Sequence, residues 1–180
     1  AIKNFRRPAL ACLWAFMLVW LTDCAQLGSI SDSLFMMSPQ QEVEFGQKVA
    51  KQVEAEYKLV QDPEIVAYVN RVGQKAWANA PKGELAPHFF VVDNKEINAF
   101  AIPGGNVYVH TGLINAADDE AELAGVISHE LGHVIGRHGA RQVSRTTGVQ
   151  IIEQIVVGSE GGQVAQLVSG IVSQGVMFNY

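Results

Sequence analysis

The most regular hydrophobic pattern in the chain runs from residue 123 to residue 135. Its apolar residues recur at steps of three and four, which is the periodicity of an amphipathic helix. They are Leu123, Val126, Ile127, Leu131, Val134 and Ile135. Four acidic residues between 118 and 122 precede them, as is common in a first helical turn. We therefore predict a helix here, with an end or kink where Gly136 and Gly139 bracket two polar residues.

Two further helices are predicted earlier in the chain. Ser38-Pro39 is a typical helix start, and apolar spacing continues from there to about Tyr57. Asp62-Pro63 begins the next helix, with aspartate as the N-cap and proline in the first turn. Its apolar face extends to Trp77.

Three short segments have the composition of β-strands. His88–Val92 is rich in aromatic and β-branched residues. Ile97–Ile102 is a second short strand segment, and apolar and polar residues alternate in Asn106–His110. Asp93–Lys95 reads as a turn, and Gly104-Gly105 suits a hairpin connection. The economical prediction is a small antiparallel sheet of three strands.

The rest of the chain is predicted to be helical. Gln142–Val157 is a largely apolar helix, Gly158–Gly162 is a flexible break, and Val164–Met177 is an amphipathic helix that contains Gly and Ser. Neither contains 18 consecutive apolar residues, so no membrane span is predicted there. The predicted fold class is α+β, with N-terminal helices, a small antiparallel sheet, a central helix at 123–135 and a helical C-terminal part.

Residues 1–24 have the features of a targeting segment, and residues 25–37 read as a polar tether. Basic residues precede the apolar run Ala9–Leu21, which is short for a membrane span. The run ends near Cys24 in a sequence that resembles the lipobox of bacterial lipoproteins, whose cysteine is lipidated. Asp23 departs from that pattern, which requires a small residue. An ordinary secretory signal and an uncleaved anchor are the alternatives.

Composition excludes several other classes of protein. The net charge is −5, which does not suggest nucleic-acid binding. Both cysteines, Cys12 and Cys24, lie near the N-terminus. The remaining chain can therefore form neither a disulfide framework nor a thiolate metal site.

The candidate chemistry lies on the predicted helix at 123–135. His129, Glu130 and His133 form the pattern H-E-x-x-H. Residues four apart lie on one face of a helix, so both imidazoles can bind one Zn²⁺ per chain. Glu130 then lies beside the ion as a general base. The alternative is a surface helix with two unrelated histidines.

A catalytic zinc site needs a third protein ligand. His138 comes one position too early for the metzincin spacing. If the helix continued, His138 would lie about 180° round from His129, so we expect it to support the site rather than bind the metal. Glu153 and Glu160 have no supporting pattern, and Glu153 fits a solvated helix face. His88 and His110 fit ordinary hydrogen-bonded histidines in strands.

Two stretches carry a family resemblance. Residues 96–113 read EINAFAIPGGNVYVHTGL, and residues 122–133 read ELAGVISHELGH, followed by Arg137-His138. Both resemble the HtpX/BepA-type zinc metalloendopeptidases, peptidase family M48. Asp62-Pro63 and its flanking helices look like the N-terminal part of the BepA-type periplasmic members. The resemblance covers about residues 40–140.

The resemblance implies a gluzincin, in which a glutamate from a later helix is the third zinc ligand. In the family, this glutamate belongs to an E-x-x-x-D pattern that follows a Phe-x-Tyr-like sequence. Phe178–Tyr180 looks like that lead-in. We expect residues 38–180 to be the metallopeptidase domain of a longer protein, with the third ligand just beyond Tyr180 and the site incomplete without it.

The resemblance also implies how substrate binds. In gluzincins an extended peptide pairs with an edge strand above the metal, and Asn98, Ala99, Phe100 and Ala101 look like that strand. Free backbone groups at a sheet edge can pair with any extended peptide, so unfolded segments would be preferred. The alternative is that these four residues are only sheet core.

The predicted function is a zinc-dependent endopeptidase on the periplasmic side of the bacterial cell envelope. Its expected substrates are misfolded or unassembled proteins, and its expected membrane link is the N-terminal segment or a lipid on Cys24. His129 and His133 would bind zinc, and Glu130 would carry the proton from water to the leaving amine. The alternative is a non-enzymatic envelope lipoprotein that binds nonnative proteins as a chaperone. The sequence does not indicate the identity of the substrate or the oligomeric state.

Overall fold

The computed structural model describes residues 37–147, together with Gly162 and Gly170. The elements in this range are α2 (Pro39–Glu56), α3 (Pro63–Asn79), β1 (His88–Val92), β2 (Ala99–Ala101), β3 (Asn106–His110), α4 (Thr111–Ala116), α5 (Glu120–Ile135) and α6 (His138–Thr147). The predicted α+β class is confirmed. The predicted targeting segment 1–24, nearly all of the tether and the lead-in Phe178–Tyr180 lie outside the described residues. Helix α6 overlaps the start of the helix predicted at Gln142–Val157 but begins earlier, at His138. The rest of that helix, and Val164–Met177 apart from Gly170, also lie outside the described residues. No helix among those described is long and apolar enough to cross a membrane.

Helices α2 and α3 begin where their capping residues predict. The Ser38 hydroxyl accepts a hydrogen bond from the Gln41 amide at 3.2 Å, and the Gln41 side chain accepts one from the Ser38 amide at 2.8 Å. The Asp62 carboxylate accepts from the amides of Glu64 and Ile65 at 2.9 and 3.3 Å. These side chains bind backbone donors that have no partner within the helix, and so fix each start.

The sheet has three strands, as predicted, but the prediction that it is antiparallel throughout is wrong. Its strand order is β1-β3-β2. Strands β2 and β3 pair antiparallel through the predicted hairpin, where Gly104 and Gly105 have φ values of 89° and 93°. Strand β1 instead pairs parallel with β3, so that His88 lies opposite Asn106.

The parallel pairing results from the segment 93–98, which crosses the end of β3 instead of forming a tight turn. The Asn94 carbonyl accepts hydrogen bonds from the Gly112 amide and the Thr111 hydroxyl, both at 2.8 Å. A Cβ at Gly112 would lie 2.2 Å from the Lys95 carbonyl oxygen, so only glycine allows this close crossing. On the other side of β1, Leu59 forms an antiparallel bridge with Val92.

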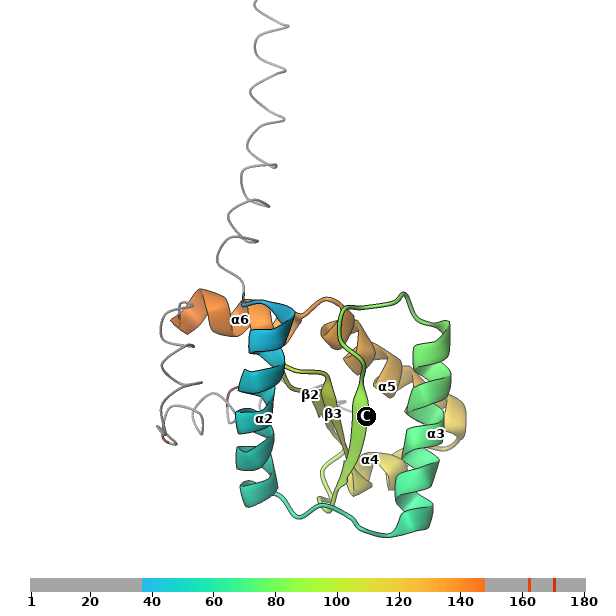
Figure 1. Ribbon diagram of the computed structural model, residues 1–180. Coiled ribbons are helices and arrows are strands. Elements are labelled where there is room, and N and C mark those ends of the chain that lie inside the picture. Colours follow the sequence, from blue (N-terminus) through green and yellow to red (C-terminus); the bar gives the residue numbers. More distant parts are fainter. Residues whose placement is uncertain (1–36, 148–161, 163–169, 171–180) are drawn as a thin grey trace, which may run out of the picture. The chain divides into compact units, whose positions relative to one another are not determined.

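Helices cover both faces of the sheet, and each face has its own apolar core (Figure 1). Helix α2 and the start of α6 pack on the face that carries Phe90, Phe100 and Tyr108. The Tyr108 ring stacks between the other two, with ring centroids 5.2 and 5.1 Å away. Helices α3, α4 and α5 pack on the opposite face, against Phe89 and its neighbours. Helix α5 is therefore held along its length by the sheet and α3.

Candidate metal centre

Helix α5 carries the H-E-x-x-H residues, and its extent confirms the predicted helix. The Asp119 carboxylate accepts hydrogen bonds from the amides of Ala121 and Glu122 at 2.8 and 3.0 Å, which fixes the first turn. The apolar stripe that predicted the helix is its buried face. Glu130 shares that buried face, whereas His129 is exposed and His133 half-buried.

The two histidines aim their Nε2 atoms at one another, 3.2 Å apart. Their ring centroids are 5.0 Å apart and the ring planes meet at 64°. Two nitrogens that each lie about 2.0–2.1 Å from a tetrahedral ion are about 3.3–3.4 Å apart. The observed spacing therefore matches two ligands of one tetrahedral ion. Burial lowers the pKa of His133, and the charges of His129 and His138 lower it further, which favours the neutral form that binds metals.

Glu130 is a buried carboxyl group, with 3% of its surface exposed. Burial raises its pKa to about 7, and a backbone hydrogen bond from Ala101 opposes the shift. Its Oε1 atom has no hydrogen-bond partner within the described part of the chain. A buried oxygen in this position can accept a proton from a water molecule beside the histidines.

Together these three residues form the one group in residues 37–147 that meets the spacing for a metal ion. One ligand atom from each lies within 4.8 Å of those of the other two. Two imidazoles and a carboxylate are donor types that zinc accepts. The structure thus brings together the predicted ligands His129 and His133 and the predicted base Glu130, whose roles stay predictions. Glu153, Glu160 and the expected third ligand lie outside the described residues.

His138 lies next to His133 because helix α5 ends at Ile135. On a continuing helix His138 would lie on the far side from His129, but the helix ends here, as the two glycines predicted. Instead Arg137 takes a left-handed φ of 51°, and the chain turns back. His138 Nδ1 lies 3.0 Å from His133 Nδ1, on the side of the ring away from His129. It is therefore outside the three-residue group.

The segment Asn98–Ala101 lies at the edge of the sheet, because β2 pairs with β3 alone among the described strands. The Asn98 carbonyl accepts from the His110 amide, and the Ile102 amide donates to the Asn106 carbonyl. In an antiparallel pair, alternate residues face the partner strand, so the backbone groups of Ala99 and Ala101 face away from β3. The side chains of Asn98, Ala99 and Phe100 are buried, so the segment is both sheet core and backbone edge.

The geometry of two contacts at this site could not be predicted from the sequence, although a supporting role was expected for His138. The Ala101 amide reaches Glu130 from a strand that is 29 positions earlier in the chain. The contact of His138 with His133 depends on a left-handed residue that is not glycine. Spacing along one helix predicts neighbours on that helix only, so both contacts required the tertiary structure.

The other two histidines lie away from the group. His88 is exposed at the start of β1. His110 is buried at the end of β3, where its ring meets Phe100 edge-on with centroids 5.8 Å apart. The structure places both in strands, as predicted, but neither ring nitrogen of His110 has a hydrogen-bond partner within the described residues, so the prediction of an ordinary hydrogen-bonded histidine is not met there.

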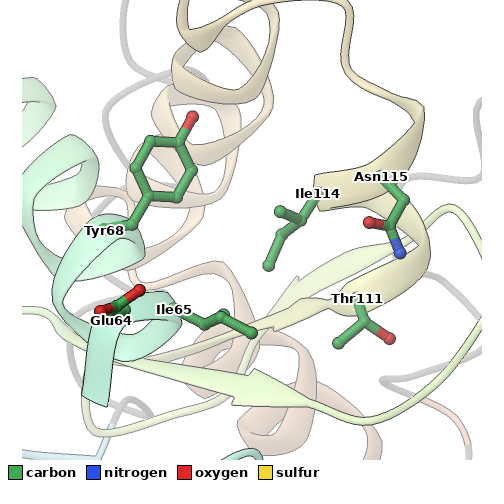
Figure 2. Close-up of a pocket in the computed structure, with 6 residues that line it drawn as sticks. All are labelled: Glu64, Ile65, Tyr68, Thr111, Ile114 and Asn115. Carbon is green, nitrogen blue, oxygen red and sulfur yellow. The ribbon is translucent and has the colours of Figure 1, made fainter. Parts of the chain in front are cut away.

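A separate cavity of 370 Å³ opens between α3 and α4. Figure 2 shows Ile65 and Tyr68 of α3 facing Ile114 of α4, with Glu64, Thr111 and Asn115 around them. None of the three H-E-x-x-H residues lines it. The cavity is therefore not part of the candidate metal centre.

Comparison with known proteins agrees with this geometry. The family model for Peptidase family M48 matches residues 60–178. The beta-barrel assembly-enhancing protease of Yersinia pestis is 42% identical over 105 residues, which cover 58% of this chain and 22% of the relative. The protein of the same name from Escherichia coli strain K12 is 40% identical over 101 residues, covering 56% of this chain and 21% of the relative.

A more distant match is the mitochondrial metalloendopeptidase OMA1 of Arabidopsis thaliana. It is 38% identical over 66 residues, which cover 37% of this chain and 14% of the relative. The chain thus spans about a fifth of the length of the first curated relatives it matches. The family resemblance that the two sequence stretches indicated is confirmed.

Proposed function

The chain belongs to peptidase family M48 and so carries a metalloprotease domain, and we propose that this domain is a zinc-dependent endopeptidase. The observation that carries this proposal is the convergence of His129 Nε2, His133 Nε2 and the Glu130 carboxyl group within 4.8 Å. An unrelated surface helix gives no reason for the carboxyl group next to the histidines to be buried, with an oxygen that has no hydrogen-bond partner among the described residues.

Each residue of the group has a separate role in the proposed reaction. His129 and His133 hold the zinc ion through Nε2. When bound, the ion supplies Lewis-acid chemistry to water and to the peptide carbonyl. Glu130 accepts the proton of the attacking water and passes it to the leaving amine. Its pKa of about 7 allows both steps near neutral pH.

Strand β2 is the proposed guide for the substrate. The N–H and C=O of Ala99 and the C=O of Ala101 face away from β3 and can pair with an extended peptide. The Ala101 amide also reaches Glu130, so a peptide on this edge would pass the catalytic carboxyl group. The buried side chains of Asn98 and Phe100 anchor this edge of the sheet in the core. Only an extended segment can form such pairing, which favours unfolded polypeptides over folded ones.

The cellular role rests on the relatives and on the N-terminal sequence. Proteins named beta-barrel assembly-enhancing protease are 40–42% identical to the matched part of this chain. We place the protein on the periplasmic side of the bacterial envelope, attached through its N-terminal segment or a lipid on Cys24. Its substrates there would be misfolded or unassembled proteins, and nucleic acid is not among its partners.

The test is cleavage of an unfolded protein, together with zinc content, in the full-length protein. Reduced and alkylated casein should be cleaved, and a folded, disulfide-bonded protein such as lysozyme should not. A chelator should stop cleavage, and added zinc should restore it. About one zinc ion per chain should be present.

Two results would contradict the proposal. Cleavage that persists without zinc would show that the reaction does not require the metal. Binding of unfolded casein with no cleavage, in a protein loaded with zinc, would favour the non-enzymatic chaperone instead.

A further inference from the structure

The turn after α5 brings a third histidine against the candidate metal centre. Helix α5 ends at Ile135, Gly136 caps it, and Arg137 takes the left-handed φ of 51°. The His138 ring then lies over Gly136, where an added Cβ would stand 2.5 Å from His138 Nε2. Any larger residue at this position would displace the ring of His138.

Buried charge fixes the unusual conformation of Arg137. Its Nε donates to Glu42 at 2.6 Å, and its two terminal nitrogens donate to Glu84 at 3.0 Å and to the Met37 carbonyl at 2.7 Å. Only 14% of the Arg137 side chain and 3% of the Glu42 side chain are exposed. The second Glu42 oxygen accepts from the Gly104 amide at 3.3 Å. A left-handed non-glycine residue persists when its surroundings determine it in this way.

His133 uses its two ring nitrogens in opposite directions. Its Nε2 faces His129 Nε2 at 3.2 Å, and its Nδ1 faces His138 Nδ1 at 3.0 Å. A neutral imidazole carries one N–H, and a nitrogen that binds a metal carries none. If Nε2 binds the metal, Nδ1 must carry the proton. His138 Nδ1 is then the acceptor, and the proton of His138 is on Nε2.

We propose that His138 is a positioning residue of the metal centre, which holds His133 in the tautomer and orientation that present Nε2 to zinc. This inference rests on the proposed function and adds a fourth residue to its machinery. Ligand histidines are generally held by an acceptor on the nitrogen that does not bind the metal. His138 supplies that acceptor from α6, and the Arg137–Glu42 pair keeps it there.

Two other roles for His138 fit the geometry less well. As a zinc ligand it would have to turn a nitrogen toward the Nε2 pair, whereas its Nδ1 faces the opposite side of His133. As a packing residue it would contribute little, because it is exposed. Its contact with His133 is the one that links it to the site.

The test compares His138→Ala with His138→Asn in the full-length protein. The zinc dissociation constant is measured by competition with a chromophoric chelator at fixed pH. His138→Ala should weaken zinc binding about 10–100-fold. His138→Asn should restore most of it, because the Asn oxygen lies close to the place of Nδ1 and can accept the same hydrogen bond. Arg141→Ala, an exposed change on the same helix, is the matched control and should leave zinc binding unchanged.

A second readout follows the tautomer directly. Long-range ¹H–¹⁵N spectra of the zinc-loaded wild-type protein should show His133 with its proton on Nδ1 and a slowly exchanging N–H. That N–H should exchange faster in His138→Ala and slowly again in His138→Asn. A purely structural role would lower thermal stability in both variants and would not separate them in this spectrum.

The outcomes separate the inference from the proposed function. Equal zinc affinity in wild type and His138→Ala, or an equal loss in both variants, overturns the positioning role. A wild-type protein that binds zinc without cleaving any unfolded substrate overturns only the proposed function. A wild-type protein that takes up no zinc overturns both.

Discussion

At Glu130, burial favours the protonated carboxyl group, while the proposed reaction needs the carboxylate. Burial raises its pKa to about 7, and the positive charge of a bound ion would favour the ionised form again. A general base is most effective when its pKa lies near the working pH. The position of Glu130 between the core and the two histidines therefore suits proton transfer in both directions.

Replacing Glu130 by glutamine should separate catalysis from metal binding. Glutamine has nearly the same size but accepts no proton at neutral pH, so cleavage should fall about 10²–10⁴-fold while zinc content is kept. His129→Ala should instead lower zinc content together with cleavage. Metal analysis and peptide cleavage on both variants make the comparison. Loss of zinc from Glu130→Gln would make Glu130 a ligand, and wild-type cleavage would refute its role as base.

His110 should make stability depend on pH. Burial lowers its pKa below the ordinary 6.5, against an opposing contribution from Glu96. Below pH 6.5 the unfolded chain therefore binds a proton that the folded chain resists, so the free energy of unfolding should decrease as the pH falls from 6.5 toward the lower folded pKa. Protonation of Glu130, whose pKa is raised to about 7, acts in the opposite direction over the same range, so urea unfolding at pH 7.5 and 5.5 measures the decrease in a Glu130→Gln background. His110→Phe, which keeps a ring against Phe100, should reduce it.

The control for this prediction is Val92→Ala, which removes buried volume from the same core without removing a titratable group. Val92→Ala should lower the free energy of unfolding, and the decrease at pH 7.5 should equal the decrease at pH 5.5. A pH dependence unchanged in His110→Phe would assign the effect to other groups.

At the scale of the element, helix α5 depends on its first turn. Asp119 binds the amides of Ala121 and Glu122, two donors that have no partner within the helix. Asp119→Ala should therefore lower the free energy of unfolding by about 0.5–2 kcal/mol. Asp118→Ala is the matched control, because Asp118 contacts Glu122 through its backbone amide. Urea unfolding should give a lower free energy of unfolding for Asp119→Ala than for Asp118→Ala. Equal values for the two variants would exclude Asp119 as the cap.

The strands show what local pattern can and cannot predict. The ends of β1 and β3 agree with the alternation and turn residues of the sequence. The pairing of β1 was mispredicted because Asp93–Lys95 looked like a tight turn. In the structure this segment is bound by Thr111 and Gly112 across the end of β3, contacts that no local pattern encodes. Helix α4 was likewise absent from the prediction, since six residues are too few for a periodic signal.

At the scale of the whole molecule, the two cores of residues 37–147 should hold the fold without the metal. Helix α5 packs on the sheet and α3 through Leu123, Ile127 and Leu131, none of which belongs to the metal group. Removal of zinc should therefore abolish cleavage but leave the far-ultraviolet circular dichroism unchanged. The melting temperature should rise with added zinc as expected for a ligand that binds only the folded state. Unfolding on chelation would show that the metal is structural.

The sequence by itself determined the helices with strong caps, the extents of β1 and β3, the H-E-x-x-H helix and the family, whereas β2 (Ala99–Ala101) is shorter than the predicted Ile97–Ile102. These features depend on periodicity and capping within a few neighbouring residues, and such local patterns can be recognised in the sequence. Only the tertiary structure decided the parallel pairing of β1, the approach of Ala101 to Glu130, and the return of His138 to His133. Each of these depends on segments far apart in sequence, such as the Arg137–Glu42 pair across 95 positions. A pattern within one element contains no information about its partner in space.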